Sequence, residues 1–265
     1  MLKKLMAVGM VLLSGLTLAA CQAKLGVDEH TNKQQGLVAV VKGDAPGSSL
    51  NYQYGDTSGK VKVSDGRYVL SVPVKTNDQT IKLSSGSQSV SAKVKKATPL
   101  GQYSKIATAY NQAIIVGSLP QAISAQVMKN PAILKTNPEA AKAYQTAMVS
   151  TKDQQLAPTA ETGLHQLMKQ SDLTIRGNIE GDQLVAAALI VPVSAMKDKA
   201  KATAFVKEVA AMSSAVGADP KAVLKAFQNA QKKSKQKTTI DTIKSNGVKF
   251  DVGVSTTQLY LYVTK

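Results

Sequence analysis

A serine and a lysine three residues apart form the first pair in this sequence that could catalyse a reaction. Ser194 and Lys197 fit the spacing S-x-x-K, in which a lysine one helical turn away can take the proton of a serine nucleophile. The companion motifs S-D-N and K-T-G are absent, and Ser234 with Lys237 fits the same spacing. Ser194 also follows Pro192 closely, where a helix N-cap residue is expected. A serine hydrolase or peptidase-like enzyme is therefore kept only as an alternative.

The other residues of catalytic or metal-binding type do not form a motif. Segment 55–60 has glycines and a lysine, as a phosphate-binding loop does, but three residues separate the glycines where four are needed, which favours a hairpin loop. His30 and His165 are the only histidines; we expect His30 in a polar tether and His165 on a short helix. Glu180 and Asp182 flank an expected turn, where carboxylates are common. We therefore predict no catalytic residue, no metal ligand and no cofactor.

The first 21 residues have the organisation of a bacterial export signal. Lys3 and Lys4 precede an apolar stretch from Leu5 to Leu18, which is too short to span a membrane. Leu18-Ala19-Ala20-Cys21 then resembles the lipobox of bacterial lipoproteins. The resemblance implies that residues 1–20 are removed, that Cys21 carries diacylglycerol, and that the chain is held at a membrane outside the cytoplasm. The alternatives are an ordinary secretory leader with a chance cysteine and a retained membrane helix.

The chain has a strong excess of lysine. Its formal net charge is +16, and without the two leader lysines 31 basic residues remain against 17 acidic ones. Only Arg67 and Arg176 are arginines, so the surface can attract anions but has few planar groups for bidentate phosphate recognition. The densest basic clusters are Lys93, Lys95 and Lys96, and then Lys232, Lys233, Lys235 and Lys237.

These lysine clusters have two interpretations. They can be a solvated strand edge and helix end, where lysine prevents edge-to-edge pairing and suits the helix dipole. They can also dock the protein on an anionic cell-wall polymer or on lipid headgroups. Nucleic acid is not expected as a partner, because the leader directs the chain out of the cytoplasm and no binding motif is present. Cys21 is the only cysteine, which excludes an intramolecular disulfide.

Composition and periodicity divide the mature chain into three parts. Residues 21–36 carry the lipidated cysteine and a polar stretch without periodicity, which favours a tether. Residues 37–97 contain six short alternating segments separated by turn signals, typical of a small β-sandwich. Among them Asp65-Gly66 is the strongest hairpin signal, and the segment from Asp65 to Pro73 resembles bacterial immunoglobulin-like surface modules. That resemblance implies a spacer or interaction module.

Residues 98–265 alternate between helical and strand periodicity. The expected helices are short ones from Tyr103 onward with an N-cap at Asn137, a short one with Leu164, Leu167 and Met168, one over 205–216 and one with an N-cap at Asp219. The expected strands cover 173–179 and 184–191, and a three-stranded meander runs from Thr238 to the end. We expect strand 173–179 at the outside and 184–191 in the centre, because only the second is apolar throughout. Tyr260 and Tyr262, like Tyr52 and Tyr54, could line a sugar or ligand surface, but we expect the commoner arrangement, in which such pairs pack beneath helices.

The predicted fold class is α+β: a small N-terminal, Ig-like β-sandwich followed by an α+β domain with helices packed on an antiparallel sheet. The whole arrangement is similar to surface lipoproteins of lactobacilli, which implies a Gram-positive cell surface but no activity. Our leading hypothesis is a non-enzymatic, lipid-anchored module that binds a component of the envelope. Two alternatives stay open: a hydrolase that uses Ser194 and Lys197, and a lipid or peptide carrier or folding helper with an apolar cavity.

Overall fold

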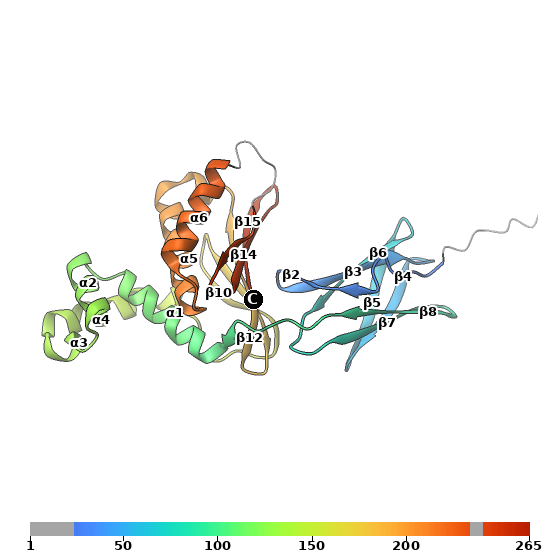
Figure 1. Ribbon diagram of the computed structural model, residues 1–265, viewed down its shortest axis with the longest axis horizontal. Helices are drawn as coiled ribbons and strands as arrows, with labels where there is room; N and C mark the ends of the chain where they lie inside the picture. Colours follow the sequence, from blue (N-terminus) through green and yellow to red (C-terminus); the bar gives the residue numbers. More distant parts are fainter. Residues whose placement is uncertain (1–23, 234–240) are drawn as a thin grey trace, which may run out of the picture.

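The computed structural model describes residues 24–233 and 241–265, with side chains of the helix before the gap described as far as residue 229. Cys21, Lys235 and Lys237 therefore lie outside the described residues, as do the side chains of Lys232 and Lys233. The described part forms an all-β N-terminal module and a larger C-terminal module of helices and strands (Figure 1). No helix in the described part is long and apolar enough to cross a membrane.

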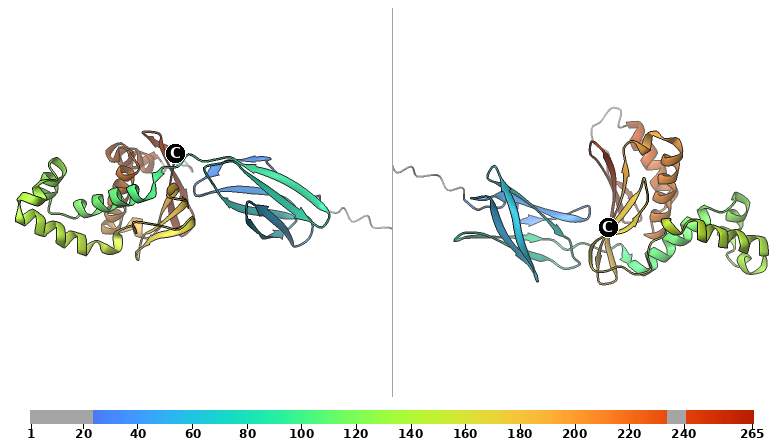
Figure 2. Two further views of the ribbon diagram at one scale, coloured as in Figure 1. Left: turned by 90° about the horizontal axis from the view of Figure 1, so that it is seen from below. Right: turned by 180° about the vertical axis from the view of Figure 1, so that it is seen from behind.

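The N-terminal module is one eight-stranded sheet that curls nearly into a barrel (Figure 2). Its strands are β1 (Thr31–Asn32), β2 (Gln34–Gln35), β3 (Val38–Asp44), β4 (Ser49–Tyr54), β5 (Thr57–Ser64), β6 (Arg67–Pro73), β7 (Gln79–Ser85) and β8 (Gln88–Val94). They follow the order β1-β8-β7-β4-β5-β6-β3-β2. The six longer strands confirm the six predicted between residues 37 and 97.

Alternation along these strands creates the core of the N-terminal module. Val41, Leu70 and Leu83 point inward from different strands and are almost completely buried, while the residues between them face solvent. Asp65 and Gly66 form the predicted hairpin turn between β5 and β6, and both have positive φ, 51° and 74°. Only two residue pairs join β5 to β6, so the sheet bends sharply there and folds over its own core.

The prediction of a tether over residues 21–36 is wrong for residues 24–36, which belong to the N-terminal module. Leu25 is only 6% exposed and lies in its core, and β1 pairs in parallel with β8. The Tyr68 hydroxyl donates a hydrogen bond to the Gly26 carbonyl at 3.0 Å, and Asp28 forms an ion pair with Arg67 at 2.5 Å. The polar composition of this segment gave no sign that it belongs to the module, because its contacts are mostly made by the backbone and by one buried leucine.

The C-terminal module is a seven-stranded sheet with helices. Its elements are β9 (Gly101–Gln102), α1 (Tyr103–Gly117), α2 (Gln121–Lys129), α3 (Ile133–Thr136), α4 (Pro138–Ser150), the 3-10 helix η1 (Lys152–Gln154), β10 (Gly163–Lys169), β11 (Thr174–Glu180), β12 (Gln183–Pro192), the 3-10 helix η2 (Ala195–Lys197), α5 (Lys199–Ala215), α6 (Pro220–Lys233), β13 (Ile243–Ser245), β14 (Val248–Val254) and β15 (Gln258–Thr264). The sheet order is β10-β11-β12-β15-β14-β13, and β9 pairs with β12.

All pairs in this second sheet are antiparallel, and helices α1, α5 and α6 cover one of its faces (Figure 1). The structure thus confirms an α+β class with helices on an antiparallel sheet. Leu261, Val263 and Phe250 point to the helices and are at most 1% exposed. Helices α2, α3 and α4 project away from the sheet around a small core of their own (Figure 1). The predicted caps are confirmed: Asn137 accepts from the backbone of α4 and Asp219 from that of α6.

Two predictions about the C-terminal sheet are wrong. The short helix predicted from Leu164, Leu167 and Met168 is strand β10, and a bulge between Gln166 and Met168 is what gives its apolar residues a helix-like spacing. Because β10 lies outside it, β11 is an interior strand and not the outer one. Strand β12, apolar along its length, is central as predicted, and β13–β15 form the predicted meander.

The sheet face opposite the helices contacts the N-terminal module. The buried Asn178 side chain donates hydrogen bonds to the carbonyls of Leu37 and Val74, at 3.3 and 2.7 Å. Tyr260 and Tyr262 lie on this face, so the prediction that they pack beneath helices is wrong. A Cβ atom at Gly36, whose φ is +63°, would come within 2.5 Å of the Tyr262 ring, so only glycine fits this close approach.

Candidate functional site

Ser194 and Lys197, the predicted alternative catalytic pair, lie exposed around η2. Their only hydrogen bond in the described structure joins the Lys197 amide to the Ser194 carbonyl at 3.1 Å. The Ser194 side chain makes no capping bond, and Asp198 instead caps α5 by accepting from the amides of Ala200 and Lys201. The structure therefore gives this serine no base in contact and no enclosed site.

The remaining motif residues have structural roles. His165 lies on β10, not on a helix, with its Nε2 atom 3.0 Å from the Thr162 carbonyl oxygen, and His30 contacts the Ser91 carbonyl at 3.4 Å. Segment 55–60 belongs to the β4–β5 hairpin, as predicted. Glu180 accepts a hydrogen bond from the Thr76 amide of the other module. No group of three or more metal-ligating side chains exists among the described residues.

Of the predicted lysine clusters, Lys93, Lys95 and Lys96 are described, and all three are exposed. Lys95 forms an ion pair with Asp78 at 3.0 Å, and hydrogen bonds from the Lys96 amide and the Lys95 side chain lower the pKa of that carboxyl. Lys95 and Lys96, but not Lys93, line a groove of about 910 Å³ between the two modules.

Three further lysines line this groove, and the sequence analysis missed them. Lys33 comes from the N-terminal module, and Lys249 and Lys265 come from the C-terminal sheet. Asp251 is an acidic residue of the lining, and Tyr262 also contributes to it. Because these lysines are far apart in the sequence, no local charge count could have grouped them.

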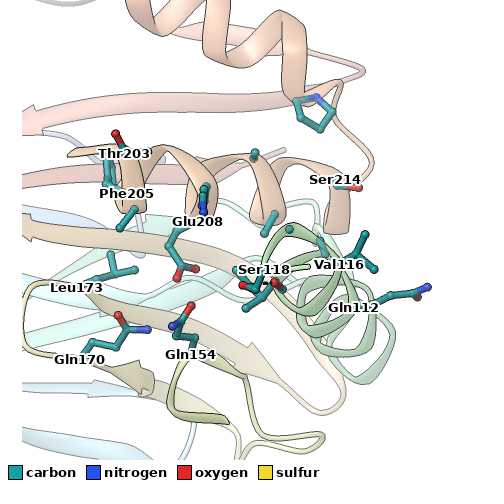
Figure 3. A pocket seen from close by; sticks show the side chains of 18 of the residues that line it. Gln112, Val116, Ser118, Gln154, Gln170, Leu173, Thr203, Phe205, Glu208 and Ser214 are labelled. Carbon is teal, nitrogen blue, oxygen red and sulfur yellow. Dashed lines mark hydrogen bonds between the residues drawn. The ribbon is translucent and has the colours of Figure 1, made fainter. Parts of the chain in front are cut away.

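A second and more apolar pocket, of about 990 Å³, lies in the C-terminal module between the helices (Figure 3). Its walls come from α1, α2, α5, the start of α6, the loop before β11 and the end of β12. Aliphatic and aromatic side chains line it, among them Val116, Val127, Leu173, Val191, Met196 and Phe205. Cavities of this size and character commonly bind small apolar molecules.

Glu208 on α5 places a carboxyl group in this pocket, although the residue is only 5% exposed. The Tyr110 hydroxyl of α1 donates a hydrogen bond to its Oε2 atom. Burial raises the pKa of Glu208 to about 7; the hydrogen bond from Tyr110 opposes this shift, and the charge of Asp153 adds to it. Burial and the neighbouring carboxyl also raise the pKa of Tyr110.

Two glutamines share the polar end of the pocket with Glu208. Figure 3 shows the side chains of Gln154, Gln170 and Glu208 directed toward one another across the cavity. The Nε2 atom of Gln170 is buried and has no hydrogen-bond partner within the described part of the chain. A buried amide without a partner costs about 1–3 kcal/mol, so a ligand that bonds to it would be stabilised.

No protein-family model matches this chain, and no curated protein does. The geometry of the pocket must therefore carry the functional argument. Its carboxyl can bind or exchange a proton near neutral pH, and in the described structure the Tyr110 hydroxyl is the side chain that forms a hydrogen bond with it. A pocket with apolar walls and a few polar groups is typical of ligand-binding sites.

Sequence reasoning missed Glu208, although a signal was present. The apolar face of α5 includes Phe205, Val209 and Met212, and Glu208 lies three residues after the first and four before the last. A carboxylate within an apolar helix face is rarely buried without a partner, so this position marks a site.

Proposed function

We propose that this protein is a lipid-anchored, non-enzymatic binding protein of the bacterial cell surface, whose C-terminal module binds an apolar ligand. The single observation that supports the binding activity is the pocket of about 990 Å³ with apolar walls and one polar end. In this proposal the N-terminal module is an Ig-like spacer between membrane and binding site. The signal for the anchor is the sequence Leu18-Ala19-Ala20-Cys21.

Native mass spectrometry tests the binding activity on a chain that begins at Gln22 and so keeps every described residue. After exposure to a lipid extract, we expect a bound small molecule that is released on collisional activation. Ala113→Phe should weaken the adduct, because Ala113 is half-buried in the pocket wall and a phenyl group there would occupy part of the cavity. Ala122→Phe is the matched control, since Ala122 is exposed on α2 and does not line the pocket. Equal adducts on both variants would reject the pocket as the binding site.

The anchor is tested separately. We expect metabolic labelling with a fatty acid to mark the wild-type chain, and Cys21→Ser to abolish the label and release the protein into the medium. Two buried acyl chains hold a protein at a membrane, with about 0.8 kcal/mol per methylene, so loss of the acylation site should detach it. An unlabelled wild-type chain would contradict the anchor and the cell-surface location together.

The lysine groove supports a second binding role, docking on an anionic polymer of the envelope. Five lysines, contributed by both modules, line it, whereas Asp251 is the one acidic side chain among the described residues of the lining. Such a surface attracts polyanions with little specificity for their chemical structure, since lysine is a hydrated point charge. This role would raise the local concentration of the protein at the wall and is independent of the apolar pocket.

A further inference from the structure

The apolar pocket contains a negative group whose position restricts what can occupy it. Figure 3 shows the Glu208 carboxyl directed into the cavity. Its Oε2 atom accepts a hydrogen bond from the Tyr110 hydroxyl. Within the described part of the chain, no lysine or arginine forms an ion pair or hydrogen bond with Glu208. Asp153, which is also acidic, raises the pKa of Glu208 further.

The lysines of the pocket lining are exposed and form no ion pair with this carboxyl in the described structure. Lys201 is engaged with Asp172 at 3.0 Å, and neither Lys201 nor Lys207 contributes to the pKa shift of Glu208. The charged groups in the pocket lining, besides Glu208, are Asp172 before β11, Lys201 and Lys207 on α5, and Asp219 and Lys221 at the start of α6. Tyr110 on α1 and Asp153 on η1 act on the Glu208 carboxyl but do not belong to the lining.

Burying an ionised carboxylate without a countercharge is costly, and a cation brought in by a ligand offsets part of that cost. A ligand carboxylate would add a third negative group next to Glu208 and Asp153. A neutral alcohol would gain the same apolar contacts as either ion but no ion pair. The order of affinity should therefore be ammonium first, alcohol second and carboxylate last.

We propose that the pocket binds an apolar amine, with its hydrocarbon part against Val116, Leu173 and Phe205 and its ammonium group donating hydrogen bonds to the Glu208 carboxylate. This proposal rests on the binding function proposed above and adds the chemical class of the ligand. The stabilised contact is a charge-assisted hydrogen bond to a carboxyl that is only 5% exposed, and such bonds are about twice as strong as neutral ones. Gln154 and Gln170 lie near enough to the same end of the cavity to orient the head group (Figure 3).

Isothermal calorimetry with three matched probes tests this, using the chain from Gln22 onward at pH 8. The probes are octylammonium, octanol and octanoate, each below its aggregation limit. We expect octylammonium to bind at least about tenfold more tightly than octanol, and octanoate more weakly than octanol. Glu208→Gln should lower the affinity for octylammonium by at least about tenfold and remove its preference over octanol, because the ammonium then lacks a countercharge. The control Ala122→Phe, at an exposed position outside the lining, should keep the wild-type preference for octylammonium.

Changing the pH provides a readout that a merely structural glutamate would not give. Ammonium binds the ionised carboxyl, so octylammonium affinity should fall about tenfold from pH 8 to pH 6 as Glu208 takes up its proton. In the Glu208→Gln variant the affinity for octylammonium should not change between these pH values. Equal affinity for octylammonium and octanol would overturn the amine proposal and leave the apolar binding function standing. Failure of all three probes to bind would overturn both.

Discussion

Replacing Phe250 with alanine is expected to lower the free energy of unfolding of the C-terminal module by about 3–5 kcal/mol. Phe250 is completely buried on β14, where it packs in the core between the sheet and the helices. The loss combines the transfer free energy of the removed ring with the cavity left behind, because a sheet paired on both sides of β14 cannot collapse into the space.

Urea unfolding followed by circular dichroism measures this effect. For a module of this size, with an m-value of about 2 kcal/mol/M, the transition midpoint should move by roughly 1.5–2.5 M. Val254→Ala is the control on the same strand, since Val254 is 64% exposed and its truncation should change stability by less than about 0.5 kcal/mol. Similar shifts for both variants would mean that Phe250 is not in the core.

The second expected result is a pH-dependent stability difference between the wild type and Glu208→Gln. Burial raises the pKa of Glu208 from its ordinary 4.5 to about 7, so the folded state holds the proton more tightly than the unfolded chain. This contribution to stability is complete below pH 4.5 and is lost as the pH rises through 7. Glutamine keeps an acceptor for the Tyr110 hydroxyl but cannot ionise. The free energy of unfolding of the variant therefore does not fall in this way as the pH rises.

The free energy of unfolding of the variant, minus that of the wild type, should rise by about 3 kcal/mol from about pH 4.5 to about pH 7.5. Taking this difference cancels the titration of every group that both proteins share. Urea unfolding at a series of pH values provides the measurement. A difference that stays flat across this range would show that Glu208 has an ordinary pKa and is not buried in the folded protein.

Both expected results concern the C-terminal module, whose core positions the residues of the apolar pocket. Phe250 belongs to the rigid sheet that supports α5, and Glu208 is the group that α5 presents to the pocket. A buried carboxyl that destabilises the empty protein at neutral pH is a common property of ligand sites, since the ligand supplies the missing partner. Binding of an ammonium group would reduce this destabilisation of the folded protein.

Most of the secondary structure could be predicted from the sequence, because one-sided burial leaves a period in the chain. The strands of residues 37–97, helices α5 and α6, the caps at Asn137 and Asp219, and the final hairpins follow from such local signals. Strand β10 was missed for a physical reason: its bulge places apolar residues at helical spacing. Residues 24–36 were missed because backbone pairing with β8 and β3, rather than apolar content, holds them in the sheet.

The candidate sites depended on the tertiary structure. The sequence alone determined the lipobox-like signal, the lysine excess and the absence of a catalytic motif, because each is a property of neighbouring residues or of composition. Only the fold decided that Glu208 faces a cavity beside Tyr110, which lies 98 positions away in the chain. Likewise, only the fold joined Lys33 to Lys249 in one groove. Burial and charge proximity in space set pKa values and ligand chemistry, and they arise from packing between distant segments. The apolar face of α5 could therefore mark Glu208 as unusual, but it could not show the cavity or the Tyr110 partner.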